Sequence, residues 1–168
     1  MDPHVARLAA LFRGHPAWRS AAGFVGNNAT SAVYFTHRPD EAWRLVRRDG
    51  VTVLEPGAAD DPDFVFRFTP AAVERLDAVD GGVGEFAATL FELIVDADED
   101  QGVGFRIAAG FPRLVARGYL RLLLAAGPEV LRFGLVHGVS TLRALRRLVD
   151  ELRTRPPEPW ESPGPSGG

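Results

Sequence analysis

Residues 43–70 read WRLVRRDGVTVLEPGAADDPDFVFRFTP and hold the clearest structural signals of the chain. Two runs rich in apolar and β-branched residues, 43–48 and 51–55, stand on either side of Asp49-Gly50. An Asp-Gly pair between two such runs is the strongest short-range signal for a β-hairpin. We therefore expect two antiparallel strands joined by a tight turn.

The second half of the same stretch predicts a strand that leads into a helix. After an acidic loop over 56–62, Phe64, Phe66 and Phe68 alternate with other residues, so they share one face of a strand over 63–69. Thr69-Pro70 is typical of a helix start, with Thr as the N-cap and Pro in the first turn. The spacing of apolar residues predicts that this helix covers 71–79.

The same patterns predict the remaining elements on both sides. Apolar residues at helical spacing predict helices over 4–12, 85–96, 110–126 and 139–153, and β-branched and aromatic runs predict strands over 32–36 and 103–109. A turn is expected at Arg38-Pro39-Asp40. The expected fold class is α+β, with a mostly antiparallel five-stranded sheet covered by helices on one face. We expect a single domain over 1–155, followed by a disordered Pro/Gly/Ser tail over 156–168.

The composition excludes several classes of chemistry. The chain has no cysteine, which removes disulfides, thiolate nucleophiles and cysteine-ligated metal centres. All nineteen basic residues are arginine, so neither a Schiff-base lysine nor a P-loop lysine exists. No apolar run approaches the roughly 18 residues of a membrane span, and the first residues do not predict a signal peptide. We therefore expect a cytoplasmic protein.

No constellation of residues predicts catalysis, a metal or a cofactor. The four histidines are scattered, without the paired spacing typical of metal ligands, and no serine stands in a G-x-S-x-G elbow. The glycine-rich segments 81–84 and 102–104 lack a following Gly-Lys-Ser/Thr. The sequence favours a binding protein over an enzyme. A small hydrolase whose site assembles from distant residues stays open as an alternative.

Charge is spread unevenly along the chain. Residues 1–102 hold nine arginines against seventeen acidic residues, whereas residues 103–155 hold ten against three. Such asymmetry is typical of a protein with an anionic partner, or of two halves that neutralise each other within one domain. The second interpretation is favoured. Nucleic acid is not expected, because aromatic residues are not interleaved with the arginines.

The helix expected over 110–126 carries two contrasting faces. Arg113, Arg117 and Arg121 recur at four-residue spacing and form one stripe. This stripe is a candidate for contact with an anionic headgroup or a membrane surface; alternatively, it pairs with the acidic first half of the chain. The opposite face is strongly apolar, and sequence alone does not distinguish a filled core from a hollow one.

The order of signals over 31–79 resembles the sterol carrier protein 2 domain family. The motifs that carry the resemblance are the strand closing on Asp49-Gly50, the following strand, the acidic loop ending in Asp61-Pro62-Asp63, and the strand that leads to the helix capped by Thr69. A looser resemblance extends over 103–126. The resemblance to this family implies a small α+β domain that holds sterols, fatty acids, fatty acyl-CoA or other lipids in a tunnel between sheet and helices. It also implies that the domain performs no chemistry of its own.

The function implied by this resemblance is binding or transfer of an apolar ligand, such as a fatty acid, an acyl chain or a sterol-like lipid. Ten apolar residues, chosen by face and by resemblance, are the candidate lining: Phe66, Phe68, Phe86, Leu90, Ile94, Phe105, Ile107, Phe111, Leu114 and Leu123. The alternative is a solid-core module that binds a protein partner through the amphipathic helix over 139–153.

Overall fold

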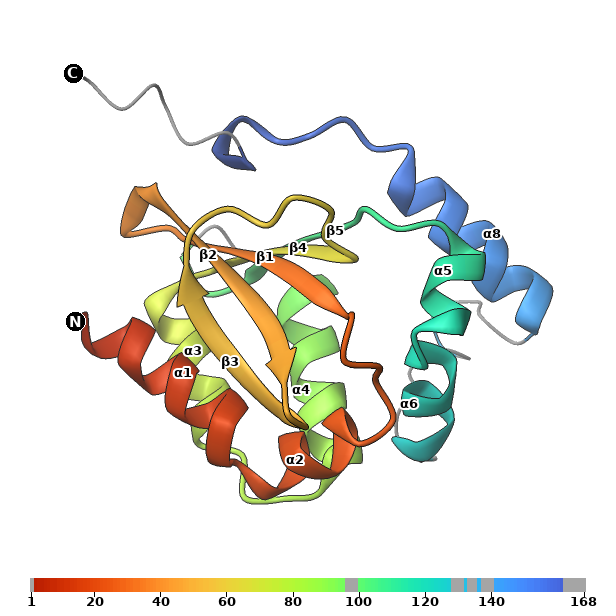
Figure 1. Ribbon diagram of the computed structural model, residues 1–168, viewed down its shortest axis with the longest axis horizontal. Helices are drawn as coiled ribbons and strands as arrows, with labels where there is room; N and C mark the ends of the chain where they lie inside the picture. Colours follow the sequence, from red (N-terminus) through yellow and green to blue (C-terminus); the bar gives the residue numbers. More distant parts are fainter. Residues whose placement is uncertain (1, 96–99, 128–131, 133–135, 137–140, 162–168) are drawn as a thin grey trace.

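A computed structural model describes residues 2–95, 100–127, 132, 136 and 141–161. These residues contain one five-stranded sheet in the order β3-β2-β1-β4-β5 (Figure 1). The strands are β1 Thr30–Phe35, β2 Arg38–Arg48, β3 Val51–Pro56, β4 Phe64–Phe68 and β5 Val103–Ile107. Neighbouring strands run antiparallel except β1 and β4, which are parallel. The α+β class and the mostly antiparallel five-stranded sheet are therefore confirmed.

The predicted Asp-Gly hairpin joins β2 to β3. Asp49 and Gly50 have φ values of 51° and 79°, both in the left-handed region. A type I′ hairpin turn requires positive φ at both central residues. The backbone twist of such a turn matches the twist of the two strands it joins. Arg48 pairs directly with Val51 across the turn.

The prediction of a turn at Arg38-Pro39-Asp40 is wrong, because these residues belong to β2. The chain reverses at Thr36-His37 instead, and Arg38 already pairs with Phe35 of β1. The local turn preference of Pro39 and Asp40 is overridden by their place at the open end of a strand, where Pro is tolerated.

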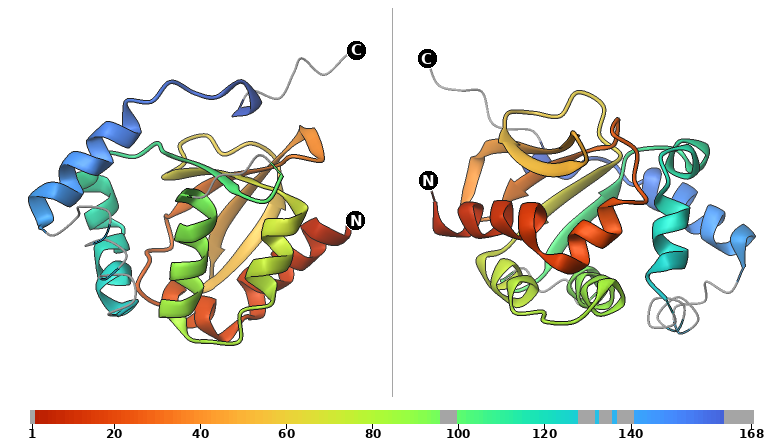
Figure 2. Two further views of the ribbon diagram at one scale, coloured as in Figure 1. Left: turned by 180° about the vertical axis from the view of Figure 1, so that it is seen from behind. Right: turned by 60° about the horizontal axis from the view of Figure 1, so that its bottom comes forward.

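Four helices pack on one face of the sheet: α1 Pro3–Gly14, α2 Pro16–Ala22, α3 Pro70–Asp77 and α4 Val83–Val95 (Figures 1 and 2). As predicted, Thr69 caps α3, its hydroxyl accepting a hydrogen bond from the N–H of Ala72 at 3.1 Å. α2 has no counterpart among the helices expected from the sequence. It begins where Nδ1 of His15 accepts from the N–H of Ala17 at 3.2 Å, directly after the end of α1.

The main hydrophobic core fills the space between the sheet and these four helices. Leu8, Phe35, Phe68 and Leu76 are among its largest side chains, and each is at most 1% exposed. Full burial of such a side chain stabilises the fold by about 1.5–3 kcal/mol. This part of the helix-covered face is therefore closed to solvent.

The prediction of a single helix over 110–126 is wrong, because this segment forms two helices. α5 Phe111–Ala116 and α6 Tyr119–Ala125 meet at Gly118, which has a φ of 90°. This backbone conformation suits glycine and ends the first helix. A Cβ on Gly118 would lie 1.9 Å from the carbonyl oxygen of Phe24, so the break also permits close docking on the loop after α2.

The last long helix, α8 Leu142–Arg153, lies beside α5 near β5 (Figures 1 and 2). α8 ends at Arg153, as predicted, and begins at Leu142 with Thr141 as its N-cap, whereas the prediction covered 139–153; residues 139 and 140 lie outside the described range. Val149 is buried in a second, smaller core cluster with Ile107, Ala109 and Leu114. This cluster joins α5 and α8 to the edge of the sheet.

The outer face of the sheet carries a small buried cluster of Ala32, Tyr34 and Val65. The 3-10 turn Pro159–Glu161 binds there: the hydroxyl of Tyr34 donates to the carbonyl of Glu161 at 2.8 Å, and Nε of Arg106 donates to the Glu161 carboxylate at 2.8 Å. The tail predicted to be disordered from 156 onward thus has defined contacts at Glu161, while residues 162–168 lie outside the described range.

Candidate functional site

Three phenylalanine rings lie side by side on the helix-covered face of the sheet. Phe66 of β4 and Phe105 of β5 are register partners with ring centroids 5.3 Å apart. The rings of Phe64 and Phe105 are 5.6 Å apart and nearly parallel, with an interplanar angle of 26°. Alternation along each strand puts all three side chains on one face. We call Phe64, Phe66 and Phe105 the aromatic floor.

The aromatic floor is less covered than its neighbours on the same face. In the adjoining row of register partners, Phe35, Phe68 and Val103 are each at most 1% exposed. The three floor residues, by contrast, are only half-buried. Apolar rings that stay partly open on the inner side of a sheet are typical of a ligand-binding surface.

The aromatic floor lies on the seam between the two hydrophobic clusters. Phe66 packs against the main core, as do Leu90 and Ile94 of α4. Phe64 and Phe105 pack against the second cluster, which α5 and α8 help to form. The floor is thus bordered by α4 on one side and by the α5–α8 unit on the other.

A buried carboxylate stands at one end of the floor. Asp63 directly precedes β4, and it is fully buried. Its side chain accepts hydrogen bonds from Nε of Arg113 at 3.0 Å, from the guanidinium of Arg117 at 2.5 Å and from the hydroxyl of Tyr119 at 3.0 Å. The ring of Tyr119 meets Phe64 edge-on at 4.7 Å. We call Asp63, Arg113, Arg117 and Tyr119 the Asp63 hub.

The charges of the Asp63 hub are matched locally. Arg113 also donates to the carboxylate of Asp61 at 2.5 Å, so two guanidinium groups face two carboxylates. The backbone of Asp63 is held as well, because its N–H donates to the carbonyl of Thr30 at 2.7 Å. The hub therefore anchors α5 and α6 to the sheet, and the neighbouring carboxylate of Asp61 balances its remaining positive charge.

Burial raises the pKa of Tyr119 well above the ordinary value of 10, and the negative charge of Asp63 adds to this effect. Burial also raises the pKa of Tyr34, with a further contribution from the charge of Glu161. A raised pKa means that folding favours the neutral phenol. Its contribution to stability is complete below pH 10 and is lost as the pH rises above the ordinary value.

We expect the folded protein to resist tyrosine ionisation. At about pH 10.5, near the ordinary pKa of a phenol, it should show much less tyrosinate absorbance than the urea-unfolded chain, because Tyr34 and Tyr119 are its only tyrosines. Absorbance should then appear together with alkaline unfolding. Tyr119→Phe isolates Tyr34 and serves as the control. Half-ionisation near pH 10 in the folded protein would contradict the burial of both hydroxyls.

The structure divides the ten predicted lining residues into three groups. Four are half-buried and pack against one of the two clusters: Phe66, Leu90, Ile94 and Phe105. Four are at most 6% exposed within the two clusters: Phe68, Phe86, Ile107 and Leu114. Two are half-buried on α5 and α6: Phe111 and Leu123. Their role in lining a ligand site stays a prediction.

Three residues of this region were not predicted as site residues: Phe64, Asp63 and Tyr119. Phe64 shares a strand face with Phe66, and that alternation was a sufficient signal to include it. Asp63 and Tyr119 are 56 positions apart in the chain, and their hydrogen bond arises only from the fold. No local pattern identifies such a pair.

The predicted arginine stripe is divided by the structure. Arg113 and Arg117 belong to the Asp63 hub, whereas Arg121 is exposed. Arg113 and Arg117 therefore follow the interpretation in which the stripe pairs with the acidic first half of the chain. Contact of the stripe with a headgroup or a membrane stays a prediction.

The apolar side of α8 is largely engaged within the chain. Val149 is 5% exposed, and Leu152 packs half-buried against the second cluster. Leu145 and Leu148 are half-buried. A partner protein that docks on this helix would therefore find little of its apolar stripe open.

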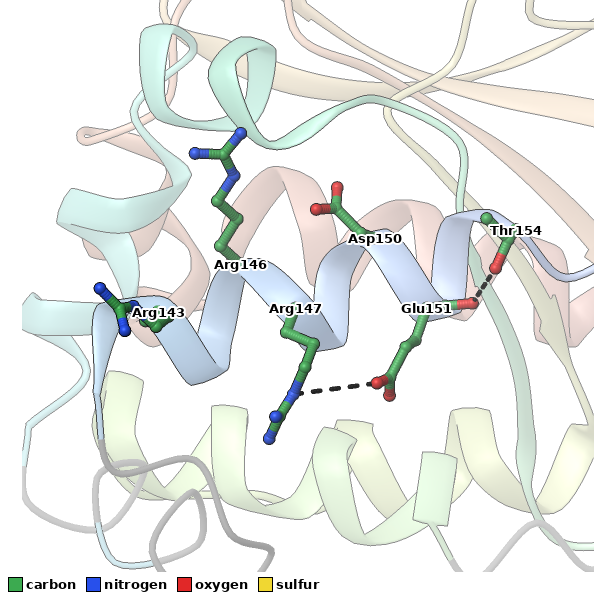
Figure 3. A pocket seen from close by; sticks show the side chains of 6 residues that line it. All are labelled: Arg143, Arg146, Arg147, Asp150, Glu151 and Thr154. Carbon is green, nitrogen blue, oxygen red and sulfur yellow. Dashed lines mark hydrogen bonds and ion pairs between the residues drawn. The ribbon is translucent and has the colours of Figure 1, made fainter.

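Two open hollows stand out on the described surface, and both lie away from the floor. One is lined by Asp2, His37, Arg38, Pro39, Asp40 and Glu41. The other lies on α8 and is lined by Arg143, Arg146, Arg147, Asp150, Glu151 and Thr154 (Figure 3).

Within the described ranges, no three or more His, Asp or Glu side chains gather as metal ligands would. No helix in that part of the chain combines the length and apolar character needed to cross a membrane.

Comparisons with known proteins give one structural likeness. No protein-family model matches the chain, and no curated protein matches it either. A solved structure described as "UbiJ-SCP2 Ubiquinone synthesis protein" is similar over 73% of this chain and 95% of its own, with 15% sequence identity and a TM-score of 0.42. Its description names the domain family that residues 31–79 resemble.

Proposed function

We propose that the protein binds an apolar small molecule on the aromatic floor and performs no chemistry on it. The observation that supports this proposal is the contrast in burial along one face of the sheet. Phe35 and Phe68 are closed off by the main core, while the floor beside them stays half-open at the seam between two clusters. A ligand that covers the floor gains about 25 cal/mol for each Å² of apolar surface removed from water.

The proposed ligand is a lipid, such as a fatty acyl chain or a sterol-like molecule. The rings of the floor supply flat apolar contact area, and Leu90 and Ile94 of α4 supply aliphatic contact at its border. The Asp63 hub beside Phe64 is matched in charge once Asp61 is counted with it, so we expect binding to depend on the apolar body of the ligand. Affinity should therefore depend weakly on salt.

The first test is native mass spectrometry of the purified protein, followed by organic extraction and lipid analysis of co-purifying molecules. A stoichiometric apolar passenger, or uptake of a fluorescent fatty acid or sterol probe, would support the proposal. A clean apo mass together with no uptake of either probe would overturn it. The solid-core interaction module would then be the better description.

The floor itself is tested by a variant that fills its border. We expect Leu90→Trp to weaken probe binding by about tenfold or more, because the larger ring on α4, which packs against β5, would occupy ligand space and remove contacts worth a few methylene groups. The control is Val95→Trp on the same helix, where the side chain is 52% exposed. Equal probe affinity in the two folded variants would show that the ligand does not lie at the floor.

A further inference from the structure

The outward side of α8 carries three arginines in its first half. Arg143, Arg146 and Arg147 are all exposed, and they line an open hollow on the solvent side of the helix. Arg147 lies 3.9 Å from Glu151, and both side chains are largely exposed. Across the described ranges, no ion pair is formed by Arg143 or Arg146. We call Arg143, Arg146 and Arg147 the α8 arginine face.

Except for Arg153 in the last turn, the charges of α8 run against its helix dipole. The partial positive charge of a helix N-terminus favours acidic side chains there, and the C-terminus favours basic ones. α8 has no acidic residue in its first turn, and its three outward arginines precede Asp150 and Glu151 on the same side. This order costs helix stability, so stability of α8 does not explain why the arginines stand where they do.

Exposed apolar side chains accompany the arginines on this part of the chain. Val136 is 75% exposed and Leu124 of α6 is 64% exposed, the two most exposed of the large apolar side chains in the described residues. The end of α6 and the start of α8 lie on the same side of the molecule, away from the sheet (Figures 1 and 2). The helix end that carries Leu124 and the helix start that carries the arginines thus lie on one side of the molecule.

We propose that this side of the molecule, formed by the α8 arginine face and the exposed apolar side chain of Leu124, docks on the surface of an anionic lipid bilayer. Basic side chains gain about 1 kcal/mol each near such a surface, a contribution that salt screens. Exposed apolar side chains add the contact with the acyl boundary that amphipathic surfaces use. This proposal is independent of the ligand proposed for the aromatic floor.

The directions of the side chains favour a surface over a single anion. Figure 3 shows the guanidinium groups of Arg143, Arg146 and Arg147 pointing away from one another. Groups that diverge cannot enclose one phosphate, but they can each meet a different headgroup of an extended anionic surface. Nucleic acid is the less favoured polyanion here, because binding to its single strands uses aromatic stacking platforms between the basic residues.

The test is flotation of the full chain with vesicles of phosphatidylcholine alone or with roughly a quarter phosphatidylglycerol. We expect binding only to the anionic vesicles, and loss of that binding at high salt. Absence of binding to anionic vesicles at low salt would overturn the proposal. Salt-sensitive binding to an RNA without binding to vesicles would also overturn it, in favour of a nucleic-acid surface.

The triple variant Arg143→Gln, Arg146→Gln, Arg147→Gln tests the α8 arginine face. Its partitioning should fall on the order of 100-fold, since each basic residue near an anionic surface contributes about fivefold. The control with the same change in net charge replaces Arg7, Arg13 and Arg19, all exposed on α1 and α2, by Gln. Equal loss in both triple variants would mean that only net charge matters, and would overturn the assignment to α8.

The apolar part of the surface is tested separately. Leu124→Ser should weaken vesicle binding severalfold, whereas Val95→Ser, 52% exposed at the end of α4, should leave it unchanged.

Thermal unfolding provides the check on folding. The α8 triple variant should unfold no earlier than wild type, because it removes basic charge from the first half of a helix. If the triple variant binds vesicles weakly and also unfolds at a lower temperature than wild type, a structural role of the arginines would explain the loss. That result would contradict the proposal.

Discussion

Asp63→Ala is expected to lower the free energy of unfolding by about 3–5 kcal/mol. The side chain of Asp63 is fully buried, and it faces the guanidinium groups of Arg113 and Arg117. Its removal leaves the guanidinium of Arg117 without its carboxylate in a partly buried space, takes an acceptor from the hydroxyl of Tyr119, and leaves Arg113 with Asp61 alone. A lone charge of this kind costs far more than a surface ion pair contributes. Urea unfolding of both proteins measures the difference.

The matched control is Asp61→Ala. Asp61 also pairs with Arg113, but its side chain is 76% exposed. Exposed ion pairs contribute about 0–1 kcal/mol, so this variant should lose little stability. If Asp63→Ala were no more destabilising than Asp61→Ala, the Asp63 hub would not be the anchor that holds α5 and α6 to the sheet.

Gly118→Ala is expected to lower the free energy of unfolding by about 2–6 kcal/mol. A residue other than glycine at φ 90° is strained by about 1–3 kcal/mol. The new Cβ would also lie 1.9 Å from the carbonyl oxygen of Phe24 and 3.0 Å from its carbonyl carbon, so backbone must move. Overpacking of this kind adds about 1–3 kcal/mol. The loop after α2 and the α5–α6 junction could then no longer touch as they do in the wild type.

Gly14→Ala is the control for Gly118→Ala. Gly14 ends α1, and a Cβ there would meet no atom within 4 Å. Alanine restricts the unfolded chain, so this variant should be neutral or more stable by up to about 1 kcal/mol. Urea midpoints of the two variants should therefore move in opposite directions or differ widely. Equal midpoints would contradict the close approach of Gly118 to Phe24.

Elements with strong local signals were predictable from the sequence. Asp49-Gly50 specifies a turn type by its own backbone preferences, and Thr69 supplies a cap whose hydrogen bond to Ala72 spans three residues. Such signals involve neighbours in the chain and need no knowledge of the fold. The alternation of Phe64, Phe66 and Phe68 likewise fixes which face of the strand they share.

Features that depend on distant partners were not predictable. Arg113 and Arg117 look like one solvated stripe until Asp63, 50 and 54 positions earlier in the chain, is placed between them. Gly118 breaks a helix whose apolar and basic spacing continues across it, because the docking on Phe24 demands a conformation that no local pattern announces. The openness of the aromatic floor also depends on how two separately packed clusters meet, which apolar spacing does not encode.

The division of the interior into two clusters has a consequence for motion. The second cluster is small, and it ties α5 and α8 to the sheet edge through few fully buried side chains. Units held by fewer buried contacts open at lower free energy than the whole domain. We therefore expect amide hydrogens of α5 and α8 to exchange faster than those of β1 and β4. Such sub-global opening would expose the rings of β4 and β5 while the main core stays folded.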